Sequence, residues 1–221
     1  MTQPETEIRA SWRHIAGNHY DGYIDDVLAR YAEPHRHYHT ATHIMFVLRC
    51  VRDVSAASAM PLSPEVMAAA LYHDAIYDPR SGDNEANSAS LATRDLGAIG
   101  WTADRCGFVA AMIVATAGHL TDDAQLVDGH ADEHNSSDTA MLLDADLAIL
   151  GADPGAYQAY VNGVRAEYSH VDDIQWHAGR TAVLARFLQR ERLFLTDFMH
   201  ATYEHRAQAN IEAELAALRA G

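Results

Sequence analysis

Helical periodicity runs through most of the chain, and the alternating apolar and polar positions typical of strands are nearly absent. Apolar side chains recur at helical spacing in eight segments, which predict helices over 20–33, about 40–57, 84–97, 102–118, 136–150, 154–169, 173–194 and 198–219. Ser63 followed by Pro64 predicts the start of a further helix, which continues through V-M-A-A-A-L-Y-H-D-A-I-Y. Because this segment is apolar on nearly every side, we expect it to lie at the centre of the protein.

These helices favour a single all-α domain over residues 1–221. An apolar content of 48% supports a sizeable core, and the sequence contains no Ser/Gly-rich linker, repeat or low-complexity tract. We expect a motif-bearing core over about 20–150, followed by C-terminal helices over 154–219. Those helices would complete the core, cover the functional site or form a homodimer face, and the sequence leaves the oligomeric state open.

Charge narrows the classes of partner. The net charge is -15, and all 16 basic residues are arginine, which argues against an extended nucleic acid as partner. A small phosphorylated substrate remains compatible, because a metal and a few arginines can reverse the field locally. The chain has no apolar run long enough for a membrane span, and its first residues do not resemble a signal peptide, so we expect no membrane partner and a cytoplasmic location. Cys50 and Cys106 are then expected to be reduced thiols.

Imidazoles and carboxylates occur at three separate points in or beside apolar helical segments. They lie in H-Y-H-T-A-T-H-I (37–44), L-Y-H-D-A-I-Y-D (71–78) and L-L-D-A-D-L (142–147). Charged side chains in such surroundings are costly unless they are paired or bind a metal. The sequence therefore predicts one buried divalent-metal site assembled from three helices. The alternatives are a hydrogen-bonded His-Asp pair in the core and a solvated His-rich tract.

Spacing leaves two choices open within these segments. His39 and His43 are four residues apart and would share one face of a helix, either both as metal ligands or with His43 as ligand and His39 as proton donor. Asp144 and Asp146 diverge by about 200° around a helix, so only one of them should face the ion.

The motifs resemble the HD superfamily of metal-dependent phosphohydrolases, whose H…HD…D signature is matched in order by His43, His73-Asp74 and Asp146. Three longer stretches are similar to a bacterial subfamily of predicted HD phosphohydrolases. They are E-P-H-R-H-Y-H-T-A-T-H-I, Y-H-D-A-I-Y-D with the later D-N-E, and D-A-D-L-A-I-L-G, and the later R-A-E-Y is also similar. Y-H-T-A-T-H resembles the Y-H-x-x-x-H of cyclic-nucleotide phosphodiesterases.

This resemblance implies an HD-domain-like helical bundle with metal ligands His43, His73, Asp74 and Asp146. It implies that His39 is the general acid and that Asp146 rather than Asp144 binds the ion. With these roles, Asp74 or Asp146 would also orient the attacking water. The implied activity is hydrolysis of a small phosphomonoester or phosphodiester, with a nucleotide favoured. Mixed nitrogen and oxygen ligands suit Mn, Fe, Co, Ni or Zn better than calcium, with Mg also open.

Further candidates for binding substrate or a second metal are Glu85, His119, Arg36 and Tyr77. Arg165 and Arg180 are weaker candidates for binding phosphate, whereas Tyr72 is expected to pack in the core. Two other functions stay open. A di-iron oxygenase on the same scaffold would use His119 with His130 or His134, and a non-catalytic module would sense a nucleotide or metal.

Overall fold

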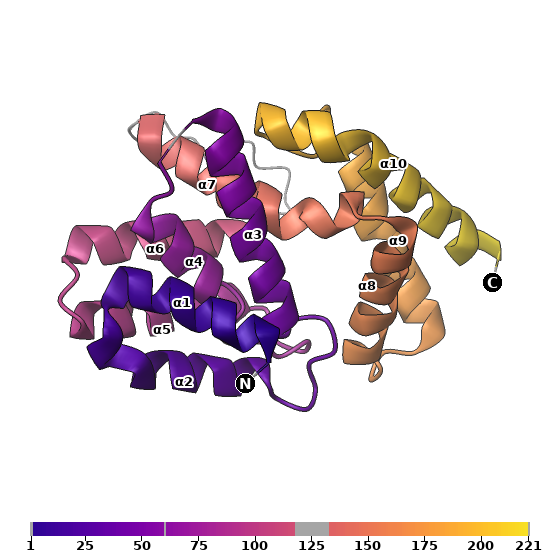
Figure 1. Ribbon diagram of the computed structural model, residues 1–221. Coiled ribbons are helices and arrows are strands. Elements are labelled where there is room, and N and C mark those ends of the chain that lie inside the picture. The colour runs from indigo at the N-terminus through magenta and orange to yellow at the C-terminus, as the bar shows by residue number, and fades with distance from the viewer. Residues whose placement is uncertain (1, 60, 118–132, 221) are drawn as a thin grey trace.

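The computed structural model describes residues 2–59, 61–117 and 133–220, and these residues form an all-α protein without strands (Figure 1). The α-helices are α1 (Gln3–Ala16), α2 (Asp21–Tyr31), α3 (Ala41–Ser58), α4 (Pro64–Tyr72), α5 (Asn84–Ala98), α6 (Ala103–Thr116), α7 (Glu133–Leu147), α8 (Pro154–Glu167), α9 (Asp173–Gln189) and α10 (Asp197–Ala220). Two short 3-10 helices are η1 (Asn18–Tyr20) and η4 (Ala148–Gly151). The expected all-α fold class is confirmed.

Helix α4 is the central helix. Its residues from Val66 to Tyr72 are all buried, and it contacts α1, α3, α5, α6 and α7. Its start follows from local chemistry, because the Ser63 hydroxyl accepts a hydrogen bond from the Val66 N–H and Pro64 occupies the first turn. A helix surrounded by neighbours can be apolar on every side, and this explains the absence of a polar face on this segment.

Helices α8, α9 and α10 lie together beside the α1–α7 group (Figure 1). Helix α10 packs against η4 and α9, and one cluster of buried apolar residues extends from Ile8 in α1 to Leu215 in α10. The last turn of α8 reaches the segment between α2 and α3, where Glu167 accepts hydrogen bonds from the backbone N–H groups of 37–39. The C-terminal helices therefore help to position the histidine-rich segment.

The expected helix through Tyr77 is wrong at its C-terminal end, because α4 stops at Tyr72. Side chains from the preceding segment bind carbonyl groups at the end of this helix and just beyond it. The Tyr31 hydroxyl donates to Leu71 O (3.0 Å), and the Arg36 guanidinium donates to Asp74 O (2.7 Å) and Ala75 O (3.1 Å). His73 and Asp74 therefore lie at the end of the central helix rather than within it.

The expected helix over 173–194 is also too long, since α9 ends at Gln189. Two buried carboxylates bind the backbone that follows. Glu204 accepts hydrogen bonds from the N–H groups of Leu193 and Phe194, and Asp144 accepts from those of Leu195 and Thr196. The backbone donors are thereby used outside a helix. Helix α1 was not among the expected helices, although Thr2 and Glu5 form a capping box at its start.

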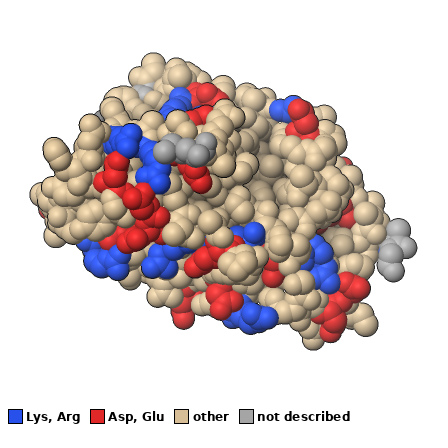
Figure 2. Space-filling view, turned by 60° about the horizontal axis from the view of Figure 1, so that its bottom comes forward, with Lys and Arg blue, Asp and Glu red and all other residues tan. Residues whose placement is uncertain are grey.

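In the part of the chain that the structure describes, no helix is both long and apolar enough to cross a membrane. On the face shown in Figure 2, arginine and acidic side chains are interspersed in small groups, with wide areas of other residues between them. Ion pairs such as Arg13–Asp21 and Arg105–Glu65 join some of these residue types in the protein. Exposed pairs of this kind add little to stability.

Candidate metal centre

Four side chains meet where α3, α4 and α7 converge. His43 lies in the first turn of α3, His73 and Asp74 follow the last residue of α4, and Asp146 lies in the last turn of α7. One ligand atom from each of the four lies within 4.8 Å of all the others. The three sequence segments that were expected to build one site are therefore brought together, and the coarse prediction of a His/Asp group able to hold a metal ion is confirmed.

The distances between these atoms suit a common ion. His43 Nε2 lies 3.2 Å from His73 Nε2, 3.4 Å from Asp74 Oδ2 and 3.2 Å from Asp146 Oδ1. His73 Nε2 lies 3.2 Å from Asp74 Oδ2 and 3.5 Å from Asp146 Oδ1. Ligands about 2.0–2.2 Å from one ion would be separated by roughly 3–3.5 Å, so the observed spacings match a shared first coordination shell.

The two imidazole rings are held in different ways. His73 Nδ1 lies 3.0 Å from Ala70 O, which accepts its proton and leaves Nε2 as the nitrogen that can bind metal. His43 Nδ1 is buried and has no hydrogen-bond partner among the described residues, but its ring lies 4.8 Å from the Tyr38 ring. Packing therefore directs His43 toward the centre, whereas a hydrogen bond directs His73.

The charges of the four groups are strongly coupled. Burial lowers the pKa of His73, but the carboxylates of Asp74 and Asp146 outweigh burial and raise this pKa well above its usual value. Burial would raise the pKa of Asp74, and the neighbouring imidazoles instead bring it well below its usual value. Protons and a metal ion thus compete for the same nitrogen atoms.

Exposure distinguishes the two sides of the centre. The side chains of His43 and His73 are 1% and 0% exposed, whereas those of Asp74 and Asp146 are 18% exposed or slightly less. The imidazoles form the floor of the site, and the carboxylates lie toward solvent. The carboxylates are therefore the part of the site that solvent reaches.

His39 lies beside this centre but not on α3. The expectation that His39 and His43 share one helical face is wrong, because α3 begins at Ala41. A turn, in which Thr40 N–H donates to Tyr38 O, still leaves the ring centroids of His39 and His43 only 5.8 Å apart. His39 is 21% exposed, so its ring is accessible next to the four clustered side chains.

Glu167, at the end of α8, anchors His39. Its Oε1 accepts hydrogen bonds from the backbone N–H groups of His37, Tyr38 and His39, and its Oε2 accepts from His39 Nδ1 (2.7 Å) and the Tyr77 hydroxyl (3.0 Å). Burial would raise the pKa of Glu167, but the hydrogen bond and charge of His39 with these backbone donors lower it to about 2. Glu167 is thus an ionised, buried carboxylate that fixes the ring orientation of His39.

The R-A-E-Y sequence contained Glu167 but gave no hint of this role. A carboxylate in the last turn of a helix is ordinarily solvent-exposed, and its partners lie almost 130 residues earlier. The available signal was indirect. The neighbouring Tyr157, Tyr160 and Val164 predict that one side of this helix is buried, and Glu167 continues that face at helical spacing.

The two aspartates of α7 point to different parts of the molecule, as their divergence predicted. Asp146 faces His43 and His73, whereas Asp144 accepts hydrogen bonds from Leu195 N–H, Thr196 N–H and the Thr196 hydroxyl. Burial raises the pKa of Asp144, although these hydrogen bonds oppose the shift. The geometry therefore places Asp146, and not Asp144, in the metal centre.

Arg36 does not have the geometry expected of a phosphate-binding residue. Its side chain is 0% exposed, and its guanidinium donates to backbone carbonyls, including those of Asp74 and Ala75, and to Glu33. These contacts leave no free face for a ligand. Arg36 instead holds the residues after α4 against the segment that precedes α3.

Tyr77 is close to the proposed acid, with its ring centroid 4.3 Å from that of His39. Burial, followed by the charge of Glu167, raises the pKa of Tyr77, so this phenol stays protonated at neutral pH. Glu85 lies in the first turn of α5 and is not one of the four clustered ligands, although its charge acts on Tyr168. Tyr77 is thus part of the His39 surroundings, and Glu85 is more remote.

The remaining candidates have structural contacts or lie outside the described residues. Tyr72 is buried and donates a hydrogen bond to Asp95, Arg165 pairs with Asp173, and Arg180 pairs with Glu214. His119, His130 and the side chain of His134 lie outside the described part of the chain. The four-residue group is the only such metal-binding cluster among the residues that are described.

Comparison of the chain with protein-family models, with curated proteins and with solved structures gives no match.

Proposed function

We propose that this protein is a metal-dependent phosphohydrolase that acts on a small phosphomonoester or phosphodiester. The observation that carries the proposal is the pairing of an accessible two-histidine, two-aspartate centre with an accessible histidine whose second nitrogen is held by a buried carboxylate. The order His43, His73-Asp74, Asp146 also matches the HD signature. A nucleotide is the substrate that this resemblance favours.

The proposed centre binds the ion through His43 and His73 on the buried side and through Asp74 and Asp146 on the exposed side. When bound, a divalent ion would acidify a water molecule and neutralise charge on the phosphoryl oxygens. The mixed nitrogen and oxygen donors suit Mn, Fe, Co, Ni or Zn, and Mg is also open. The partly exposed Asp74 carboxylate is placed to accept a hydrogen bond from the attacking water and to orient it.

His39 is the proposed proton donor to the leaving oxygen. Its Nδ1 is engaged by Glu167 at 2.7 Å, so Nε2 is the nitrogen that can deliver a proton. The carboxylate fixes the orientation of the ring, as an orienting carboxylate does for a catalytic histidine. In this role His39 contacts the substrate, Glu167 positions His39, and Tyr77 packs against its ring.

The first test is phosphate release and nucleotide conversion across a panel of nucleotides after reconstitution with Mn²⁺. The wild type is compared with Asp74→Asn, and Asp53→Asn serves as the matched control because Asp53 is an exposed carboxylate on α3. We expect turnover in the wild type and the control, and none in Asp74→Asn with unchanged helical content.

Failure to turn over any member of the panel, in protein shown to hold metal, would refute the phosphohydrolase. Two irons per chain together with oxygen consumption would point to the oxygenase. Tight nucleotide binding without conversion over hours would point to a sensor.

A further inference from the structure

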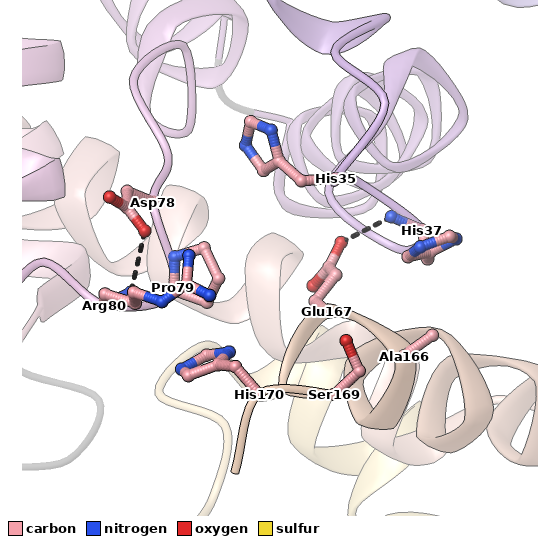
Figure 3. A pocket seen from close by; sticks show the side chains of 9 residues that line it. All are labelled: His35, His37, Asp78, Pro79, Arg80, Ala166, Glu167, Ser169 and His170. Carbon is pink, nitrogen blue, oxygen red and sulfur yellow. Dashed lines mark hydrogen bonds between the residues drawn. The ribbon is translucent and has the colours of Figure 1, made fainter.

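A hollow lies next to the His39–Glu167 pair and is not used by the proposed reaction. It has a volume of about 320 Å³ and is lined by three segments, namely the stretch before α3, the loop after the His73-Asp74 pair, and the end of α8. Figure 3 shows His35 above this cavity, Ser169 and His170 below it, and Arg80 on one side with Glu167 opposite. A cavity of this size can hold a small polar group.

The cavity wall carries hydrogen-bond donors that the protein itself does not use. Within the described residues, the side chains of Arg80, Ser169 and His170 have no hydrogen-bond or ion-pair partner, and the His170 ring is held only by stacking on Tyr168. Most arginines of this acidic chain pair with a carboxylate, as Arg165 and Arg180 do. Arg80, Ser169 and His170 are exposed, so their donors are hydrated in the free protein and are available to a ligand that enters the cavity.

Two carboxylates also line the cavity together with the single arginine Arg80, and three of their four oxygen atoms accept hydrogen bonds within the protein. Glu167 is fully buried, and both of its oxygens already accept hydrogen bonds from the backbone of 37–39, His39 and Tyr77. Asp78 is exposed, and its Oδ1 accepts the backbone N–H of Arg80 at 2.9 Å. The groups left free to contact a ligand are consequently mainly donors, which fits an anion.

The cavity and the metal centre share a thin wall. His35 Nε2 donates to Tyr77 O at 2.8 Å and its ring lies nearly parallel to that of Tyr77, whose other neighbour is His39 at 4.3 Å. The ring of His35 is 43% exposed and that of His39 is 21% exposed. A substrate could therefore lie across Tyr77, with one end at the metal centre and an anionic group in the cavity.

We propose that this cavity binds a phosphate-sized oxyanion through Arg80, His170 and Ser169. Two sources share this chemistry, a second phosphate group of the substrate and free inorganic phosphate. The first source rests on the proposed phosphohydrolase activity, whereas the second does not.

The binding test uses metal-free protein, because an empty centre of carboxylates does not attract an anion. Inorganic phosphate is titrated by calorimetry into the wild type, Arg80→Ala, His170→Ala and Arg219→Ala, the last being an exposed arginine in the final turn of α10. We expect saturable binding in the wild type and in Arg219→Ala, and affinity lower by about ten-fold or more in Arg80→Ala, because the lost hydrogen bond is charge-assisted. Absence of binding in the wild type, or equal binding in Arg80→Ala, would overturn the proposal.

A kinetic experiment distinguishes the two sources. With Mn²⁺ present, hydrolysis of a nucleoside 3′,5′-bisphosphate is compared with that of the corresponding 5′-monophosphate in the wild type and in Arg80→Ala. A rise in KM of about ten-fold for the bisphosphate alone assigns the cavity to the substrate. Unchanged kinetics, or no hydrolysis of either compound, together with phosphate binding that depends on Arg80, assigns it to free phosphate.

Discussion

The metal centre and the junction between α9 and α10 each receive an aspartate from the same helix, two residues apart. At the junction, Asp144 is 1% exposed and accepts three hydrogen bonds of 2.6–2.7 Å from Leu195 and Thr196. At the metal centre, the Asp146 side chain is 18% exposed and faces the Nε2 atoms of His43 and His73. Both carboxylates interrupt an apolar segment, yet their surroundings are opposite in kind.

The two sites differ in the groups that compensate the negative charge of each carboxylate. Backbone and hydroxyl donors surround Asp144, so it shapes the chain that follows α9 and has little capacity left for a ligand. Asp146 meets nitrogen atoms that need a proton or a cation between themselves and the carboxylate. A polar residue within an apolar helix is therefore a reason to look for a partner, and the identity of the partner separates a structural role from a metal-binding one.

The largest effect is expected for Asp146→Asn. We expect metal content to fall and turnover to drop by about 10⁴-fold, because loss of a ligand removes several kcal/mol of charge stabilisation. The metal-free variant should also lose some thermal stability, because Asp146 stabilises the protonated imidazoles of His43 and His73. Metal analysis, turnover and unfolding measurements on one preparation check this. Full metal occupancy in Asp146→Asn would place the ion elsewhere.

His39→Gln should act on turnover without affecting metal. Loss of a general acid typically lowers the rate by about 10²–10⁴-fold, and we expect about 10³-fold here. His205→Gln, at an exposed position of α10, is the control and should leave turnover unchanged. If His39→Gln instead releases the metal, the histidine is a ligand, and the division of roles between His39 and His43 is wrong.

Glu167 should make the folded state sensitive to acid. A carboxyl group whose pKa is lower in the folded chain than in the unfolded chain stabilises the fold above the unfolded pKa. That stabilisation is lost as the pH falls toward the folded pKa. For Glu167 the window runs from about pH 4.5 down to about 2, and the loss amounts to about 3 kcal/mol.

Denaturant unfolding of the wild type and Glu167→Gln across this pH range measures that contribution. The wild type should lose more stability than the variant as the solution is acidified, and the variant should also turn over more slowly because His39 is less well oriented. Parallel pH profiles of stability for the two proteins would show that Glu167 does not hold the segment before α3.

The smallest effect is expected for Asp144→Asn, and it should fall on stability alone. An amide keeps the shape but presents only one acceptor to three donors, which costs about 1–2 kcal/mol. Metal content and turnover of the folded fraction should match the wild type. Loss of metal from this variant would remove the distinction between Asp144 and Asp146. Asp53→Asn controls for the loss of one negative charge.

Local patterns determined most of the helices of this protein. Ser63 and Pro64 predicted where α4 begins, and its uniform apolarity predicted a central position, because only a helix enclosed by neighbours buries every face. The ends of α4 and α9 could not be predicted in the same way. They depend on Arg36, Asp144 and Glu204, which bind backbone groups from positions distant in the sequence.

The sequence by itself also determined the side-chain types of the candidate site and their order, and the approximate 200° divergence that sends Asp144 and Asp146 to different places. Only the tertiary structure decided which of the two meets His43 and His73, that His39 lies before α3, and that Glu167 from α8 holds it. The physical reason is the separation along the sequence between the residues that interact. Periodicity and capping are set by residues a few positions apart, whereas a buried charge is satisfied by whichever partner the packing of helices brings to it.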